Sequence, residues 1–304
     1  MTTTIFYAIF EIFGFFTIGI IARVSGYIKE QHIDSWSKFA IDYLYPFLIF
    51  STITQKLHRE MLFEVWPLPV IGFGLILLGL ILGLTFQRFL FTSNKEIRRA
   101  FVHFCAINNS AYLPIIIAHA IWGETAVVNL FLLNIGSTIG LWTIGIVVLQ
   151  NDFSLKNLKN LLSSNLIVTV ISIIIGITNL SSFFPSVLMH ICEKTGAISV
   201  PLILTITGAA IANPKALKPG WHVIYVSAMR LVIFPVVAIA ILNVLPLSSN
   251  VISISVLVSL MPVAVSSVLL IRRYGGSPEY ASGTALFSTA FALISIPVAL
   301  WILF

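Results

Sequence analysis

The chain has 304 residues, of which 58% are hydrophobic and only 9% are charged. Soluble globular domains carry about 25% charged residues, so this composition excludes a soluble fold. The formal net charge of +6 does not indicate nucleic-acid binding, because the basic residues lie in short loops between apolar segments, where they set membrane topology. The composition predicts an all-α polytopic membrane protein in contact with membrane lipids and with no nucleic acid.

Ten apolar segments follow one another along the chain, and each is close to the roughly 20 residues that cross a bilayer as a helix. A polar run at residues 150–164 lies near the middle of the chain. We therefore expect ten transmembrane helices in two repeats of five, residues 1–150 and 151–304, the second repeat inverted because five is an odd number. The segments are residues 5–24, 36–57, 65–90, 97–119, 124–149, 164–180, 185–212, 219–243, 247–271 and 279–304.

Basic residues are distributed unevenly among the loops. Most of the 17 lysine and arginine residues lie in odd-numbered loops, whereas the even-numbered loops hold only Lys56 and Arg59. Loops rich in lysine and arginine remain on the cytoplasmic side. The distribution predicts a protein of the cell membrane, inner or plasma, with both termini outside.

Prolines occur at corresponding places in the two repeats. Pro46 and Pro201 lie in the second and seventh segments, and Pro114 and Pro262 lie in the fourth and ninth. Proline lacks a backbone donor and clashes with the carbonyl four residues before it, so it interrupts a helix. Interrupted helices in matching positions of inverted repeats indicate the substrate site of a transporter. We expect helices 4 and 9 to be broken and to cross at their prolines.

Two asparagines, Asn108 and Asn109, precede Pro114 in the sequence AINNSAYLP. Backbone groups freed by a helix break must be buried in protein or face a wet cavity. The two amides could bind a ligand there, or they could hold neighbouring helices together. We favour the first alternative and predict that Asn108, Asn109 and Pro114 contribute to the substrate site.

At the second break the candidate substrate-binding residues are Pro262, Val263 and Ser266. The half-helix after each break directs free N–H groups and the positive end of its dipole toward the break, which favours a carboxylate. A serine hydroxyl can equally well bond to a carbonyl of its own helix, so both readings of Ser266 stay open.

Two further candidates lie outside the breaks. Asn134 is an amide in the fifth segment, and Ser51 follows Pro46 in the second. Packing between helices is an equally good explanation of Asn134. Two glycine pairs with GxxxG spacing, Gly79 with Gly83 and Gly136 with Gly140, predict close approach of helices rather than a nucleotide loop.

Ionisable residues inside apolar segments are costly and are therefore functional candidates. Asp42 and Glu193 precede Pro46 and Pro201 at similar distances, and either could bind a coupling proton or sodium ion. The alternative is that both are solvated near the membrane surface. Arg230 should pair with a carboxylate or attract an anion, and we favour pairing.

Other titratable residues receive no role from the sequence. Glu11, His103 and His119 cannot be assigned. Cys105 and Cys192 lie in separate segments without metal-ligand spacing, so neither a metal site nor a cofactor is expected.

The ending of the chain, MPVAVSSVLLIRRYGGSPEYASGTALFSTAFALISIPVALWIL, resembles that of the auxin efflux carrier family, which includes bacterial malate- and malonate-permease-like members. The segments ISVPLILTITGAAIA and RRAFVHFCAINNSAYLPI resemble the seventh and fourth spans of that family. The resemblance implies a scaffold domain from spans 1, 2, 6 and 7, and a mobile transport domain from spans 3–5 and 8–10. It also implies an organic-anion substrate and a homodimer.

These observations predict a secondary transporter of small organic anions, carboxylates in particular, that works by alternating access of the elevator type. A sodium-coupled organic-anion symporter resembling the bile-acid carriers is the alternative. An intramembrane enzyme would need paired aspartates, an HExxH motif or a serine–histidine pair, and none occurs at usable spacing. A channel would need polar faces on many helices, whereas polarity here is concentrated at the two breaks.

Overall fold

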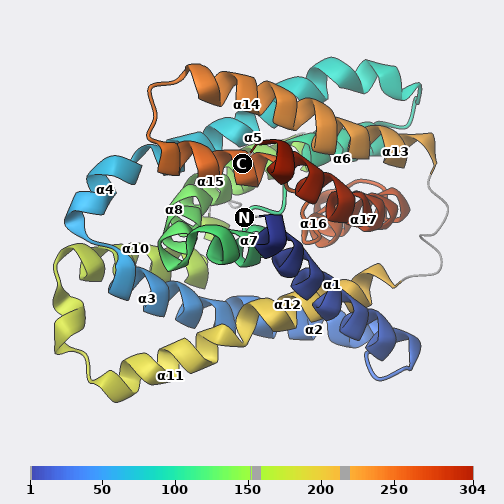
Figure 1. Cartoon of the computed structure of the whole chain (residues 1–304). Helices are drawn as coiled ribbons and strands as arrows, with labels where there is room; N and C mark the ends of the chain where they lie inside the picture. Colours follow the sequence, from blue (N-terminus) through green and yellow to red (C-terminus); the bar gives the residue numbers. More distant parts are fainter. Residues whose placement is uncertain (1, 151, 153–158, 213–219, 304) are drawn as a thin grey trace. The chain divides into compact units, whose positions relative to one another are not determined.

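A computed structural model describes residues 2–150, 152, 159–212 and 220–303, and in these ranges the chain is helical and contains no β-strand (Figure 1). Each of the ten apolar segments contains helix. The helices are α1 (Thr2–Val24), α2 (Glu30–Phe39), α3 (Tyr45–Lys56), α4 (Arg59–Val65), α5 (Pro67–Phe86), α6 (Lys95–Ala106), α7 (Leu113–Trp122), α8 (Glu124–Gly140), α9 (Ile146–Gln150), α10 (Ser164–Ile177), α11 (Ser186–Ala197), α12 (Ser199–Ile211), α13 (Trp221–Ala228), α14 (Phe234–Val244), α15 (Ser249–Ser259), α16 (Ser267–Tyr274) and α17 (Pro278–Leu303).

Short helical turns of other types join some of these helices. Three are π-helical: η1 (Ala40–Leu44) between α2 and α3, η3 (Leu141–Gly145) between α8 and α9, and η7 (Met229–Ile233) between α13 and α14. Two are 3₁₀ turns, η2 (Gln87–Leu90) after α5 and η5 (Leu180–Phe183) after α10. π turns inside longer helices are rare and often lie at functional sites.

Six continuous helical stretches of the described chain are long and apolar enough to cross a membrane. Helices α7, α10 and α15 are apolar but shorter. The all-helical, polytopic character expected from the sequence is thus present, while ten crossings and the inverted repeat remain a prediction. The six stretches are Thr3–Val24, Arg59–Leu90, Glu124–Gln150, Ser186–Ile211, Trp221–Val244 and Glu279–Leu303.

The chain divides into two compact units, and each combines segments from both halves of the sequence. The first unit comprises Met1–Pro67, Ala111–Ile135 and Leu162–Ala212, and the second comprises Leu68–Ser110, Gly136–Leu161 and Asn213–Phe304.

In the first unit, α1 packs along α12, and α3 packs against both α10 and α11 (Figure 1). Glycines make the closest approaches possible. A side chain at Gly19 of α1 would collide with the backbone of α12 at Thr205, and one at Gly208 of α12 would collide with the backbone of α1 at Phe16. The reciprocal contact explains how these two helices run in direct backbone contact.

In the second unit, α6 is surrounded by α5, α9, α13 and α17. Phe101 of α6 stacks on Tyr225 of α13 with ring centroids 5.3 Å apart, and Phe104 meets the edge of Tyr280 of α17 at 6.1 Å. These aromatic pairs, in which Phe101 and Phe104 are fully buried, fix the direction in which the C-terminal end of α6 points.

The predicted glycine contacts are confirmed in the second unit. A Cβ atom at Gly79 of α5 would collide with the carbonyl oxygen of Cys105, and one at Gly83 would lie 3.0 Å from the Cα atom of Val102. Gly136 and Gly140 approach α5 in the same way, at Pro69 and Ile76. Both GxxxG pairs therefore serve helix packing.

We expect Gly79→Ala to destabilise the protein by about 1–3 kcal/mol, because the added methyl group must push the last turn of α6 away from α5. Gly74→Ala is the matched control, since it adds the same atom to the same helix where nothing lies within 4 Å. Thermal unfolding of the purified variants in detergent measures the difference. Equal melting temperatures for the two variants would contradict the close α5–α6 contact.

Candidate functional site

The fourth apolar segment is interrupted, as predicted. Helix α6 ends at Ala106 and α7 begins at Leu113, so residues 107–112 are not helical. Pro114 is buried in the first turn of α7, where its missing N–H group would have no helical partner in any case. Pro114 therefore starts the second half of this segment, within the first unit.

The ninth apolar segment is interrupted too. Helix α15 ends at Ser259 and α16 begins at Ser267, with Pro262 buried in the non-helical stretch between them. In the second unit, residues 107–109 and 262–264 run past each other as two extended, antiparallel pieces of chain. We call this contact the crossover.

Two backbone hydrogen bonds hold the crossover together. The N–H group of Asn109 donates to the carbonyl of Pro262 at 2.8 Å, and that of Ala264 donates to the carbonyl of Ile107 at 3.5 Å. Asn108 and Val263 form the pair directly between these bonds. The structure thus brings together four predicted site residues: Asn108, Asn109, Pro262 and Val263. Pro262 lies in the crossover, whereas Pro114 lies outside it, in α7 of the first unit.

The side chain of Asn108 has a structural partner. Its Nδ2 atom donates to the carbonyl of Val258, in the last turn of α15, at 2.6 Å. The same carbonyl also accepts a hydrogen bond from the N–H group of Met261 at 3.2 Å, so the amide of Asn108 is a second donor to the C-terminal end of α15. Asn108 therefore joins the first break to the end of α15, which is the role of interhelical glue that the sequence left as the second alternative.

Arg230, in the π turn η7, is completely buried behind the crossover. Its Nε atom donates to the carbonyl of Met261 at 3.0 Å, and its two Nη atoms donate to the carbonyls of Cys105 and Ser259, each at 3.4 Å. The guanidinium carbon also lies 3.8 Å from the centroid of the Phe234 ring.

The favoured prediction that Arg230 pairs with a carboxylate is therefore wrong. Among the described residues no ion pair includes Arg230. The negative charge that faces Arg230 is partial and comes from the C-terminal ends of α6 and α15, whose last carbonyls converge on the guanidinium group. Arg230 stabilises both broken helix ends at once.

His103 is the other buried ionisable side chain at this end of α6. Its Nδ1 atom lies 2.9 Å from the carbonyl oxygen of Gly145 in η3, and its Nε2 atom lies 3.0 Å from the hydroxyl of Ser267. Ser267 is the first residue of α16 after the second break. His103 thus links three elements of the second unit, a connection that the sequence did not indicate.

The first turn of α16 differs from the helix N-terminus with free N–H groups that was expected to bind an anion. The N–H groups of Ser267 and Val268 donate to the carbonyls of Ala264 and Val265, at 3.0 and 3.1 Å. These two donors are therefore engaged within their own turn. Ser266 is exposed and occupies the N-cap position, but its side chain makes no capping hydrogen bond.

Two substrate-site candidates, Ser51 and Asn134, lie in the first unit. Ser51 is buried in α3, and its hydroxyl donates to the carbonyl of Leu48 in the same helix at 3.3 Å. Asn134 is partly exposed on α8. Their contribution to a substrate site stays a prediction.

The two ion-coupling candidates also lie in the first unit, and both side chains are exposed. The carboxylate of Glu193 accepts a hydrogen bond from Nε2 of Gln55 at 2.7 Å. The carbonyl of Asp42 accepts one from the hydroxyl of Ser164 at 3.3 Å. Glu11 and His119 are exposed as well. No group of three or more potential metal-ligating side chains occurs within the described ranges.

Comparison with known families decides the identity of the chain. The family model described as membrane transport protein matches residues 4–154 and residues 153–300, nearly the whole chain. The chain belongs to the auxin efflux carrier family. This is a family of membrane transporters, so the chain is a membrane transporter. A search of curated proteins gave no match.

Three features of this family member's crossover were missed by sequence reasoning: the carbonyl partners of Arg230, the link from His103 to Ser267, and the bond from Asn108 to Val258. One signal was present, because Arg230 is the sole arginine, lysine, aspartate or glutamate in residues 219–243. Backbone carbonyls have no sequence signature, so the partners themselves could not be found.

Proposed function

We propose that the protein is a secondary transporter that carries small carboxylates across the cell membrane by alternating access, with the crossover as its substrate site. The observation that supports this proposal is the antiparallel contact between two interrupted apolar segments. Irregular backbone at membrane depth is tolerated only where protein buries it or where it lines a cavity, and transporters place their substrates at such breaks.

The charge at the crossover favours an anion. Asn108 and Val263 form a pair without mutual hydrogen bonds, so their N–H groups point away from the partner segment. The amide of Asn109 and these N–H groups are the donors that we assign to the substrate carboxylate. The buried guanidinium group of Arg230 adds a full positive charge beside the crossover, where it donates to the carbonyl of Met261.

The same arrangement disfavours a sodium ion at this place. In transporters with broken helices, sodium binds to unwound carbonyls and to helix C-terminal ends. Here the carbonyls of Cys105, Ser259 and Met261 already accept hydrogen bonds from Arg230. The sodium-coupled symporter therefore remains the second candidate, with its ion bound elsewhere.

The division into two compact units supports a mechanism in which one body moves relative to another. The first unit contains α1–α4, α7, most of α8 and α10–α12, and the second contains α5, α6, α9 and α13–α17, so parts of the fourth and fifth spans belong to the first unit. We assign the scaffold to spans 1, 2, 6 and 7 and the mobile elevator domain to spans 3–5 and 8–10. We also propose that the protein is a homodimer, that its basic loops lie in the cytoplasm, and that both of its termini lie outside.

Uptake into proteoliposomes tests the proposed function. A panel of radiolabelled mono- and dicarboxylates is offered with and without proton and sodium gradients, and protein-free liposomes give the background. We expect saturable uptake of at least one carboxylate. Uptake that requires a sodium gradient would favour the symporter. Uptake of every carboxylate no faster than in protein-free liposomes would refute the organic-anion assignment.

The coupling hypothesis is tested at Asp42 and Glu193. If one of them binds the driving ion, its replacement by asparagine or glutamine abolishes gradient-driven accumulation but leaves exchange across the membrane intact. Glu11→Gln is the matched control, because Glu11 is an exposed carboxylate of the same unit. Normal accumulation in both Asp42→Asn and Glu193→Gln would show that these carboxylates are not coupling sites.

A further inference from the structure

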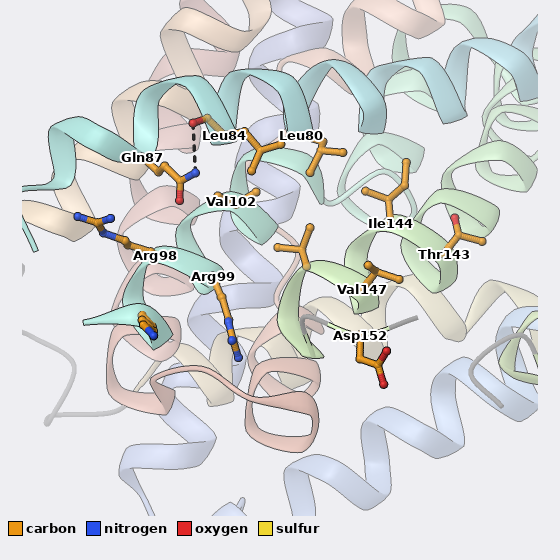
Figure 2. A pocket seen from close by; sticks show the side chains of 12 residues that line it. Leu80, Leu84, Gln87, Arg98, Arg99, Val102, Thr143, Ile144, Val147 and Asp152 are labelled. Atoms are coloured by element: carbon orange, nitrogen blue, oxygen red, sulfur yellow. Dashed lines mark hydrogen bonds between the residues drawn. The ribbon is translucent and has the colours of Figure 1, made fainter. Parts of the chain in front are cut away.

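An open cavity of about 920 Å³ lies within the second unit, between α5, α6 and the stretch formed by η3 and α9 (Figure 2). No residue of the crossover lines it. The lining side chains are Leu80, Leu84, Gln87, Lys95, Arg98, Arg99, Val102, Thr143, Ile144, Val147, Val148 and Asp152.

The cavity combines two kinds of surface. Arg98 and Arg99 extend from the first turns of α6 at one end, and Leu80, Ile144 and Val147 face the space toward the other end (Figure 2). Leu84, Val102 and Val148 extend the apolar wall, so aliphatic side chains make up half of the lining. A ligand that fits this space needs an anionic head and an apolar body.

The positive charge at the cavity is not neutralised by neighbouring carboxylates. Lys95, Arg98 and Arg99 form no ion pair with any described residue. The Nε atom of Arg98 donates to the carbonyl of Thr92 at 2.8 Å, which holds the side chain in place and leaves its terminal nitrogens available. Asp152 also lines the cavity, but it is exposed and lies beyond 4 Å of these cations.

We propose that this cavity binds a membrane phospholipid with an anionic headgroup. The phosphate lies against Arg98, Arg99 and Lys95, and the upper part of one acyl chain lies along the aliphatic wall. Arginine binds phosphate oxygens in a bidentate manner, and basic pockets between transmembrane helices recognise anionic lipid headgroups.

A small carboxylate does not account for the same lining. It would satisfy the cations but leave the aliphatic wall in contact with water, whereas an acyl chain removes that surface from water. The cations also belong to the first turns of α6, which the distribution of basic residues predicts to lie at the cytoplasmic leaflet, where anionic lipids are concentrated. The proposed lipid site is therefore separate from the substrate site at the crossover.

The experiment measures thermal unfolding of the detergent-purified protein during titration with phosphatidylglycerol, with phosphatidylcholine of the same acyl chains, with glycerol 3-phosphate, and with inorganic phosphate. We expect phosphatidylglycerol to raise the melting temperature well above the effect of the other three. In the Arg98→Gln/Arg99→Gln variant its apparent affinity should fall roughly tenfold or more, because charge-assisted hydrogen bonds are lost.

Two further variants separate the lipid site from general effects. Arg272→Gln/Arg273→Gln removes the same charge from exposed positions of α16 in the same unit and should bind phosphatidylglycerol normally. Val147→Trp fills the apolar end and should weaken phosphatidylglycerol binding without reducing the melting temperature of the lipid-free protein. Equal responses to the two phospholipids, or equal losses in both arginine double variants, would overturn the proposal. A response to inorganic phosphate as large as that to phosphatidylglycerol would assign the cavity to a free anion instead.

Discussion

Replacement of Arg230 by methionine is expected to reduce the free energy of unfolding by about 3 kcal/mol or more. Methionine retains an unbranched side chain but leaves the carbonyls of Met261, Cys105 and Ser259 without their donor. An unsatisfied buried acceptor costs about 1–3 kcal/mol, so three of them exceed the effect of an ordinary substitution. Transport should fail in the same variant, because the two broken helix ends are no longer held together.

Thermal unfolding and carboxylate uptake measure the two effects. Arg273→Met is the matched control, since it removes an exposed arginine from the same unit and should change stability by less than about 0.5 kcal/mol. Arg230→Lys should lie between wild type and Arg230→Met, because lysine keeps the charge but not the planar fork of donors. A melting temperature for Arg230→Met equal to that of Arg273→Met would show that the guanidinium group does not stabilise the crossover.

Replacement of Asn109 by alanine is expected to weaken substrate binding roughly tenfold to a hundredfold. A hydrogen bond to a charged group contributes about 1.5–3 kcal/mol, and every 1.4 kcal/mol corresponds to about a tenfold change in affinity. Asn108→Ala is the matched comparison, because it removes an identical amide that already donates to Val258. Its main effect should be on stability, by about 0.6 kcal/mol, as for other hydrogen bonds between membrane helices.

Competition for carboxylate uptake and thermal unfolding separate the two asparagines. If Asn109→Ala and Asn108→Ala both leave the apparent affinity unchanged, the crossover is not the substrate site. If Asn108→Ala lowers the affinity as strongly as Asn109→Ala, the amide that holds α15 also orients the substrate.

Helix existence and helix interruption could be read from the sequence because their causes are local. Long apolar runs predict helices, and Pro114 and Pro262 lie beside the two breaks that the structure contains. The spacing of Gly79 and Gly83 predicted close helix packing for the same reason, since glycine is the residue type that permits it, and the structure shows that the partner of α5 there is α6.

The partners within the site could not be predicted in this way. Arg230 and Asn108 donate to backbone carbonyls, which every residue carries, so composition and spacing do not distinguish Met261 or Val258 from their neighbours. The expectation of a carboxylate partner for Arg230 overlooked that helix C-termini supply partial negative charge without any acidic side chain. Ser51 is buried and its hydroxyl donates to the carbonyl of Leu48 in its own helix, a bond that the sequence did not indicate, while its contribution to a substrate site stays a prediction.

The position of the Arg230 side chain depends on the number of residues in its π turn as well as on the residue type. A π turn contains one residue more than an α turn, and an α-helix rotates by about 100° per residue. The π turn absorbs this extra residue, so deleting a single residue within Met229–Ile233 would restore continuous α-helix while α13 and α14 keep their orientation about the helix axis. In relatives of this protein, a one-residue gap at this turn would therefore remove the local bulge from which Arg230 reaches the carbonyls of the crossover, while the residues on either side keep their faces.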